Sequence, residues 1–403
     1  MSEITYRIGL LGHGTVGGAF SKMIEDRGPA IREMTGLQPV ISGILTRSQG
    51  DFRAILEDSD VIVELIGGIH PAYEYITEAL EAGRHVISAN KQLLAQHGQE
   101  LEIVAASNGV QLRFEAAVAG VVPVVRVLQE SFPALHINKL YGIVNGTTNF
   151  ILSEMEKGMG YDEALAEAQS LGYAEADPTE DVNGKDAAAK MAILAKLAYG
   201  ASIHLDQVSC SGIEDLQTDD LQYAQELGLS LKLLGVAERI NNSLSVRVHP
   251  AFLQAEHPLA SIKGTFNAVT IEAPSITEVT LSGPGAGGVQ TASSVLGDLG
   301  SIMAGCAPFP IVLNDIALLE DIESAFYIHI EVADRPGVLA VITKIMSEYQ
   351  VSVGSVIQKG KDDQARLIIV THPVLESSLF LAIDELAQHD FIRATPRVIR
   401  VIA

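Results

Sequence analysis

Two lysines stand close to carboxylates, in patterns that could move a proton or neutralise a developing negative charge. In "GYAEADPTEDVNGKDAAAK" (172–190), Asp186 and Lys190 are four residues apart, which places them on one face of a helix. Apolar residues surround Lys190, and desolvation would lower the pKa of its ammonium group toward a range useful for acid–base work. Glu175 and Asp186 could bind a substrate ammonium group. An exposed helical ion pair is the plainer alternative, and the residues alone leave both open.

A glycine-rich motif near the N-terminus could bind a dinucleotide. "GHGTVG" (12–17) follows an apolar strand at 4–12 and opens a helix from about Val16 to Asp26. In such motifs the first glycine allows a tight turn, the second admits a pyrophosphate, and the third lets helix and strand pack closely. The helix N-terminus then offers N–H groups to the anion. The order strand, motif, helix favours a dinucleotide site over a turn kept for packing.

The end of the second strand bears on the choice of cofactor. A site for NAD usually has an acidic residue there to bind the ribose 2′-hydroxyl. In "GILTRSQGD" (43–51) the nearest charged side chain is Arg47, which suits a 2′-phosphate. NADP is therefore favoured, and Asp51 leaves NAD open.

The second lysine lies where the fourth strand of the same sheet should end. In "SANKQLLA" (88–95), Lys91 is at the start of a helix, where a cation is disfavoured by the helix dipole. Ligands of open α/β sheets bind at the carboxyl ends of the strands. Lys91 is therefore predicted to lie near a bound nicotinamide.

Three kinds of element pattern predict three domains. Short apolar runs alternate with helical patterns over residues 1–130, as in a doubly wound, Rossmann-type α/β domain with a parallel sheet; the runs are 4–12, 39–45, 61–67, 85–89 and 110–116. Residues 131–323 read as α+β; the expected helices are 148–171, 183–200 and 217–228 and the expected strands are 229–239, 243–249 and 267–273. Residues 324–403 show the βαββαβ order of a ferredoxin-like domain.

Composition limits the class of partner and the compartment. Fifty Asp and Glu against 27 Lys and Arg give a net charge of −23, which argues against nucleic acid and anionic membranes as partners. Neither a signal peptide nor an apolar run long enough to cross a membrane is present, so a cytoplasmic protein is expected. The two cysteines, Cys210 and Cys306, are expected to be buried small hydrophobic residues in a reducing compartment. The histidines are scattered along the sequence, so no transition-metal site of the Cys or His type is expected.

Taken together, the motifs resemble homoserine dehydrogenase. The glycine motif, "SANKQLLA", "NGTTNFIL" (145–152), the 172–190 stretch and "GPGAGGVQTASSVLGDL" (283–299) come in the order of that family, and the tail, with "VADRPGVLA" (332–340), resembles an ACT domain. The resemblance is to monofunctional members. It implies NAD(P)-dependent interconversion of L-homoserine and L-aspartate 4-semialdehyde in threonine, methionine and isoleucine biosynthesis. It also implies that residues 131–323 bind substrate and dimerise, with a return helix to the first domain at about 289–318.

The resemblance assigns roles to individual residues. Lys190 would donate the proton, Lys91 would assist, and Glu175 and Asp186 would hold the substrate amino group with support from Asp181. The residues expected at the cofactor are Gly12, His13, Gly14, Thr15, Val16, Gly17, Arg47, Lys91, Gly172, Glu175 and Gly287. A sodium ion would be bound by the carboxylate of Glu115 and the backbone of Val118, Gly120 and Val122.

The resemblance also implies regulation and assembly, and two other functions stay open. L-Threonine is the expected effector of the ACT domain, whose alternative role is dimerisation alone, and a homodimer or homotetramer is expected. Aspartate-semialdehyde dehydrogenase would need a nucleophilic cysteine, and neither cysteine has the expected context. A sensor that binds a nucleotide without turnover is the other alternative.

Overall fold

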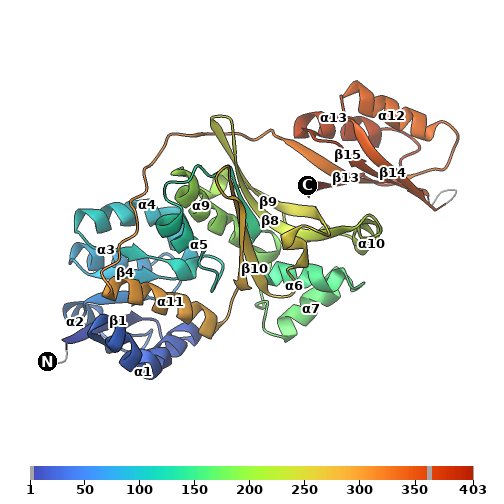
Figure 1. Cartoon of the computed structure of the whole chain (residues 1–403). Helices are drawn as coiled ribbons and strands as arrows, with labels where there is room; N and C mark the ends of the chain where they lie inside the picture. The colour runs from blue at the N-terminus through green and yellow to red at the C-terminus, as the bar shows by residue number, and fades with distance from the viewer. Residues whose placement is uncertain (1–3, 361–364, 403) are drawn as a thin grey trace.

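The N-terminal part of the molecule is a parallel sheet covered by helices on both faces. The computed structural model describes residues 4–360 and 365–402. Its first sheet has five parallel strands in the order β2-β1-β3-β4-β5: β1 (Ile4–Leu11), β2 (Leu37–Leu45), β3 (Val61–Glu64), β4 (His85–Ser88) and β5 (Leu112–Arg113). The Rossmann-type arrangement predicted from the alternating pattern is confirmed (Figure 1).

Five helices flank this sheet, and one of them, α11 (Gly288–Met303), comes from a distant part of the chain. The others are α1 (Thr15–Thr35), α2 (Phe52–Glu57), α3 (Ala72–Glu81) and α4 (Lys91–Ser107). Apolar side chains of α1 and α11 share one core with β1 and β3, whereas α3 and α4 pack on the opposite side (Figure 1). The first helix runs past its predicted end at Asp26 and through Pro29, because Ile24 and Ile31 continue its buried face.

The middle of the chain forms an antiparallel sheet with helices on one side. Its strands lie in the order β11-β10-β6-β8-β9: β6 (Lys139–Ile143), β8 (Leu229–Ile240), β9 (Ser243–Gln254), β10 (Phe266–Ala273) and β11 (Thr277–Pro284). The helices are α6 (Gly146–Met155), α7 (Tyr161–Ser170), α9 (Lys185–Tyr199) and α10 (Thr218–Glu226). The single helix predicted over 148–171 is wrong: Gly158 (φ 102°) breaks it into α6 and α7. Strands β6 and β11 were not predicted.

The tail has the predicted βαββαβ order, and its sheet joins the middle one. The elements are β13 (Glu323–Val332), α12 (Val338–Glu348), β14 (Val353–Lys359), β15 (Ala365–Thr371), α13 (Glu376–Ala387) and β17 (Arg397–Ile402). Strand β17 pairs in parallel with β9, so a single sheet runs from β11 to β14. The return helix predicted to reach residue 318 ends at Met303, because Gly305 takes φ 72° and Pro308 and Pro310 follow. An extended segment then crosses to the tail (Figure 1).

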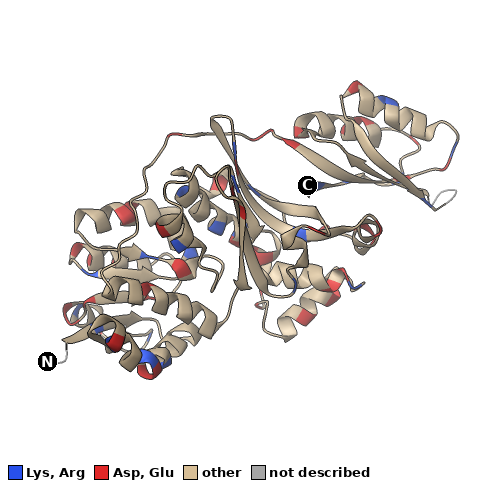
Figure 2. Ribbon diagram, viewed as in Figure 1, with Lys and Arg blue, Asp and Glu red and all other residues tan. Residues whose placement is uncertain are grey.

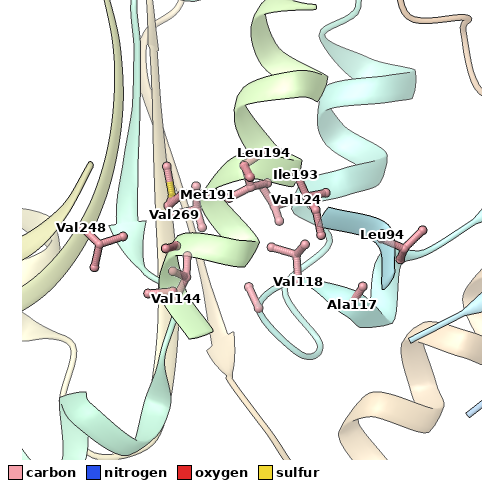
Figure 3. Close-up of a cluster of buried hydrophobic side chains, with 14 of the residues drawn as sticks. Leu94, Ala117, Val118, Val124, Val144, Met191, Ile193, Leu194, Val248 and Val269 are labelled. Carbon is pink, nitrogen blue, oxygen red and sulfur yellow. The ribbon is translucent and has the colours of Figure 1, made fainter. Parts of the chain in front are cut away.

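Helix α9 lies where the middle sheet meets the first domain. Figure 3 shows Met191 on the side of Val248 and Val269 of the sheet, and Ile193 on the side of Val118. Gly184 (φ 85°) and Gly200 (φ 67°) mark its two ends. Because α9 is buried on both sides, residues in its first turns have a fixed position relative to both domains.

Two further observations concern the distribution of charged residues and the character of the helices. Acidic and basic positions are interspersed along the ribbon in all parts of the chain (Figure 2). Among the described residues, no helix combines the length and the apolar character needed to cross a membrane.

Candidate active site

Two adjacent cavities open at the carboxyl ends of the parallel strands. The first is lined by the glycine motif and the end of β2, including Gly12, His13, Gly14, Thr46 and Arg47. The second is lined by Val16, Asn90, Lys91, Gly120, Lys190, Gly285 and Ala286, among others. Both are bordered by Leu65, Ile66 and Gly67, so together they could take an elongated ligand.

The three glycines of the motif meet different surroundings. Gly12 has φ 99°, and a Cβ there would lie 2.6 Å from the carbonyl oxygen of Leu65. A Cβ on Gly17 would lie 2.2 Å from the oxygen of Gly12. Gly14 instead faces open space at the N-terminus of α1. The chain therefore leaves room at the point where a pyrophosphate would meet helix N–H groups, and these residues fit a dinucleotide.

The two residues considered for cofactor preference have different positions. Arg47 lines the first cavity beside Thr46. Asp51 caps α2, and its carboxylate accepts a hydrogen bond from the backbone N–H of Arg53 at 3.0 Å. The Asp51 carboxylate, which had kept NAD as an alternative cofactor, is thus bound to the N-terminus of α2.

The lysines and Asp186 form one ionic cluster, called here the lysine–aspartate cluster (Lys91, Asp186 and Lys190). Lys190 Nζ donates to Asp186 Oδ2 at 2.6 Å, and Lys91 Nζ pairs with the other carboxylate oxygen. Lys190 also donates to the carbonyl oxygen of Val144 at 2.7 Å. The Asp186 side chain is 3% exposed and that of Lys190 is 12% exposed. The predicted burial of Lys190 is confirmed, but its ammonium group is paired with a carboxylate.

The charges of the cluster shift the pKa values of its members. Burial would raise the pKa of Asp186, but the two adjacent ammonium groups outweigh it and hold that pKa below its ordinary value. Burial opposes the charge of Lys91, yet the Asp186 carboxylate prevails and raises the pKa of Lys91. The pKa of Asp181 is raised by burial and by the charge of Asp186. The geometry thus favours a negative Asp186 and a positive Lys91.

Asp181 and Asp186 share a neutral neighbour that sequence reasoning missed. The side-chain Nδ2 of Asn145 donates to Asp181 Oδ1 at 2.7 Å and to Asp186 Oδ2 at 2.8 Å. Asn145 stands between β6 and α6 and caps that helix. An asparagine between an apolar strand and a helix is a capping signal that could have drawn attention to this position.

Glu64, which was also missed, orders the loop that both cavities share. Its carboxylate accepts from the backbone N–H groups of Ile66 at 2.8 Å and Gly67 at 3.2 Å, and from Ser88 Oγ at 2.6 Å. The side chain is fully buried, and burial raises its pKa. A lone acidic residue in the apolar run "VIVELIG" (61–67) was the available signal.

Two predicted site residues lie apart from the cluster. Gly172 ends α7 in an exposed turn with φ 74°, and Glu175 is exposed in the loop that follows. The backbone carbonyl of Glu175 accepts from Gln169, and neither residue is among the described residues that line the two cavities. The predicted proximity of Gly172 and Glu175 to the cofactor is not seen in this arrangement. A turn and the short helix α8 (Thr179–Val182) separate them from α9.

The other charged side chains of the stretch, Asp177, Glu180 and Lys185, are exposed. Glu180 accepts from Gln92 Nε2 of α4 at 3.0 Å, and Asp177 accepts from the backbone N–H of Thr179 at 3.2 Å. The hydrogen bond between Gln92 and Glu180 joins the N-terminal domain to the middle domain, next to Lys91. The hydrogen bond between Asp177 and Thr179 orders the turn before α8.

The segment before α11 borders the second cavity through Gly285 and Ala286, and Gly287 lies just outside the lining. Gly287 has φ 127° at the start of the helix, and a Cβ on Gly288 would lie 2.7 Å from a side-chain carbon of Thr15. The N-termini of α1 and α11 therefore lie together, with Val16 and Ala286 on the cavity wall.

The residues predicted to hold sodium surround a tight turn. Glu115 is buried; its carboxylate accepts from the backbone N–H groups of Val125 at 3.0 Å and Arg126 at 2.8 Å, capping α5 (Val124–Arg126). The oxygen of Gly120 accepts from Ser294 Oγ, and that of Val122 from the Val124 N–H. Burial, and then the charge of Asp298, raise the pKa of Glu115 to about 7. A buried carboxylate with backbone oxygens, including that of Val118, is a donor set that suits a hard cation.

Two further observations concern metals and cysteines. Over residues 4–360 and 365–402, no group of three or more His, Cys, Asp or Glu side chains is placed to hold a metal ion. The prediction that the cysteines are buried is wrong: Cys210 and Cys306 are both exposed and free. Cys210 lies on β7 (Ser209–Cys210), a two-residue strand beside β9, and Cys306 follows the turn that ends α11.

Comparison with known proteins identifies the family. The homoserine dehydrogenase of Corynebacterium glutamicum is 40% identical over 422 residues, which cover 98% of this chain and 95% of that protein. The chain belongs to the homoserine dehydrogenase family. The homoserine dehydrogenase of Bacillus subtilis is 37% identical and covers 97% of this chain and 98% of its own. Family models match in succession: "Homoserine dehydrogenase, NAD binding domain" at residues 43–115, "Homoserine dehydrogenase" at 123–299 and "ACT domain" at 326–391.

Solved structures agree with this membership. A homoserine dehydrogenase from Thiobacillus denitrificans is 35% identical and superposes with a TM-score of 0.92 over 99% of this chain and 98% of that one. That of S. aureus at pH 7.5 is 31% identical with a TM-score of 0.81, and each chain is covered in full. This homoserine dehydrogenase fold therefore combines an NAD-binding domain, a catalytic domain and a C-terminal ACT domain, and the chain is an oxidoreductase.

Proposed function

We propose that the protein reversibly reduces L-aspartate 4-semialdehyde to L-homoserine with NAD(P), in the biosynthesis of threonine, methionine and isoleucine. Family membership supports the reaction. The observation that carries the proposed site is the lysine–aspartate cluster, in which Lys91 of the nucleotide domain and Lys190 of the catalytic domain meet at Asp186 beside the cavity. Two positive groups at this place suit the stabilisation of an alkoxide.

Lys190 is the proton donor in this proposal. A lysine ammonium group has three N–H donors. Two of them are engaged by Asp186 and by the carbonyl of Val144, so the third can reach an oxygen in the cavity that Lys190 lines. The bound nicotinamide supplies or accepts the hydride, so no covalent nucleophile from the protein is needed. In oxidation Lys190 takes the proton back.

Lys91 and the carboxylates position the reactants. Lys91 lines the same cavity, and its positive charge, fixed by Asp186, would stabilise a negative substrate oxygen. Asp186 and Asp181 would hold the substrate amino group from the catalytic-domain side. Glu175 could join them if its exposed loop folds inward over the substrate.

We propose NADP as the favoured cofactor, with the adenosine end near Arg47 in the first cavity. Support comes from the position of Arg47 on the cavity wall and from the use of Asp51 as a helix cap. A hyperthermophilic archaeal homoserine dehydrogenase, 26% identical with a TM-score of 0.66, was solved in complex with NADPH. The pyrophosphate would lie at Gly14 and the N-terminus of α1, in a turn that Gly12 and Gly17 make possible.

Replacing the proton donor tests the assignment. Lys190→Ala should lower kcat for homoserine oxidation by at least about 100-fold, since general acid–base catalysis contributes that much or more, while NADPH still binds. Lys185→Ala, on the exposed first turn of the same helix, should keep kcat close to that of the unmodified chain. Initial rates with NADP and NAD, and fluorescence titration with NADPH, provide the measurements. Undiminished turnover in Lys190→Ala would contradict the role, and NADPH binding without turnover in the unmodified chain would support a sensor.

We also propose a sodium ion at Glu115, with backbone oxygens from Val118, Gly120 and Val122. The buried carboxylate and the turn that carries Gly120 (φ 66°) support it. The ion would act structurally, where the two domains meet. The same rate assay in sodium and in choline buffers tests the proposal, and equal rates with equal thermal stability would contradict it.

We propose that L-threonine binds the ACT domain and inhibits the enzyme, and that the chain forms a homodimer or homotetramer. The ACT match and the continuous pairing of β17 with β9 support regulation through this tail. Strand β11 ends the described sheet with a free edge, which could pair with a second copy. Light scattering of the purified protein would measure the assembly, and a monomeric mass would contradict it.

A further inference from the structure

Asn145 uses its whole side chain in a single arrangement. Its Oδ1 accepts from the backbone N–H of Thr148 at 2.8 Å and from Thr148 Oγ1 at 3.0 Å. Its Nδ2 donates to Asp181 and Asp186. The residue is 4% exposed. An asparagine amide can donate two hydrogen bonds and accept two, so every one is made.

The helix decides which way the amide points. The first N–H groups of α6 need an acceptor, so the oxygen must face Thr148. The NH₂ group is then directed at the two carboxylates and cannot exchange places with the oxygen. Such an orientation holds Asp181 and Asp186 at a set spacing without adding a charge.

The neighbouring backbone strengthens this arrangement. Val144, the residue before Asn145, accepts the hydrogen bond of Lys190 through its carbonyl oxygen at 2.7 Å. Two successive residues after β6 therefore contact the cluster: Val144 binds Lys190 through its carbonyl, and Asn145 binds Asp186 through its side-chain amide. The position of Lys190 follows from both contacts.

The side-chain amide of Asn145 also affects the charges of the two aspartates. Asp186 is buried and Asp181 is partly buried; their charges repel each other, and the Asn145 hydrogen bond opposes that repulsion. Lys91 and Lys190 are the cations that face the same carboxylates. Without the amide, one of the two carboxylates would tend to bind a proton, and the pairing with the lysines would loosen.

We propose that Asn145 is a positioning residue for catalysis: it separates Asp181 from Asp186 and thereby aims Lys190 and Lys91 at the substrate. The inference rests on the proposed function of the lysine–aspartate cluster. It names a residue outside the cavity wall that acts through groups on that wall.

Two variants separate this role from helix capping. Asn145→Ser and Asn145→Asp both keep an oxygen that can cap α6, and both remove the N–H groups that face the carboxylates. Asn145→Asp also adds a third carboxylate. Thr148→Val is the matched control, because it removes the hydroxyl contact at Asn145 Oδ1 and leaves the amide donors in place.

The expected kinetic results differ among the three. In Asn145→Ser, kcat/KM for homoserine should fall on the order of 10- to 100-fold, since a small misplacement of reacting groups costs about that much. In Asn145→Asp the fall should be larger, and the acidic limb of the pH–rate profile should move to higher pH, because the crowded carboxylates bind a proton more readily. Thr148→Val should stay close to the unmodified enzyme. NADPH affinity should be unchanged in all three.

The outcomes decide the inference. Unmodified kcat/KM and pH profile in both Asn145 variants would overturn it, and so would an equal loss in Thr148→Val, which would assign the effect to the surroundings of the Asn145 oxygen and not to its amide donors. If Asn145→Asp fails to fold, as judged by thermal melting and NADPH binding, Asn145→Ser carries the comparison. Absence of homoserine oxidation in the unmodified enzyme would instead contradict the proposed function.

Discussion

Asp186 is the anion that two lysines from different domains share. Its pairing with Lys190 follows from a four-residue spacing on one helix, and the sequence predicted it. Its pairing with Lys91 depends on the packing of α4 near α9, which no local pattern reports. Because both lysines neutralise the same carboxylate, removal of Asp186 would take away the anion that pairs with both of these cations.

A second buried lysine allows a pH prediction at the residue scale. Lys232 of β8 is fully buried, and its Nζ donates to the carbonyl of Ile262 at 2.6 Å and to Asn149 Oδ1 at 3.2 Å. Burial, and then the charge of Lys263, lower its pKa to about 7, while Glu156 opposes them. The lowered pKa means that the folded chain holds this proton less tightly than the unfolded chain.

The sign of the effect on stability follows from linkage. Between pH 7 and about 10 the unfolded chain binds more protons at Lys232 than the folded chain, so the free energy of unfolding rises with pH. Lys232→Met removes the titrating group. The stability of the unmodified chain relative to Lys232→Met should therefore increase from pH 7 to pH 9.5 in urea denaturation. Parallel stability curves for the two proteins would show that Lys232 does not titrate in this range.

At the scale of elements, helix α10 joins the catalytic domain to the ACT sheet. Asp220 of α10 accepts from His329 Nδ1 at 2.5 Å and from Arg397 Nε at 2.7 Å, and its side chain is buried. Asp219, one residue earlier, pairs with Arg366 at 2.8 Å and stays half exposed. A single helix therefore offers a buried and an exposed ion pair to the same sheet.

These two aspartates give a matched prediction. Asp220→Ala should lower the free energy of unfolding by about 3–5 kcal/mol, because it removes a fully buried carboxylate that the buried His329 and the partly buried Arg397 share. Asp219→Ala should cost less than about 1 kcal/mol, since exposed pairs contribute little. Chemical denaturation monitored by circular dichroism measures both. Equal losses would mean that burial does not distinguish the two pairs.

Elements also show where patterns mislead. Residues 148–171 carry a helical pattern, but Gly158 and Gly160 divide it because glycine permits backbone conformations that end a helix. Strand β6 was missed because it has only five residues, and its partner strands β8 and β10 come much later in the chain. Helix ends and short strands depend on tertiary partners more than long alternating patterns do.

At the scale of the whole molecule, the ACT domain is both separate and attached. It has its own apolar core between its sheet and helices α12 and α13. Yet β17 pairs with β9, and β9 packs against α9, the helix that carries Lys190. A ligand that binds one position of the ACT sheet more tightly than another would shift the sheet toward the first position. Through β9, such a shift could reach α9 and the active site.

Threonine inhibition is the prediction that belongs to this scale. L-Threonine should lower initial rates of the full chain, while L-valine at the same concentration should not. Asp334, in the loop between β13 and α12, accepts from Gln358 Nε2 at 3.2 Å. In the proposal, this loop forms part of the threonine site. Asp334→Ala should weaken the inhibition and keep the uninhibited rate. A full chain that L-threonine does not inhibit would contradict regulation through this domain.

Local spacing and residue chemistry determined much of this protein. The strand, glycine motif and helix, the Asp186–Lys190 pair and the βαββαβ tail could all be predicted, because each depends on neighbours within a short stretch. Tertiary structure decided the rest. It brought Lys91 to Asp186, placed Asn145 between two carboxylates, left Glu175 exposed and joined β17 to β9. These features depend on how distant elements pack, and packing is set by the apolar surfaces that the whole chain buries together.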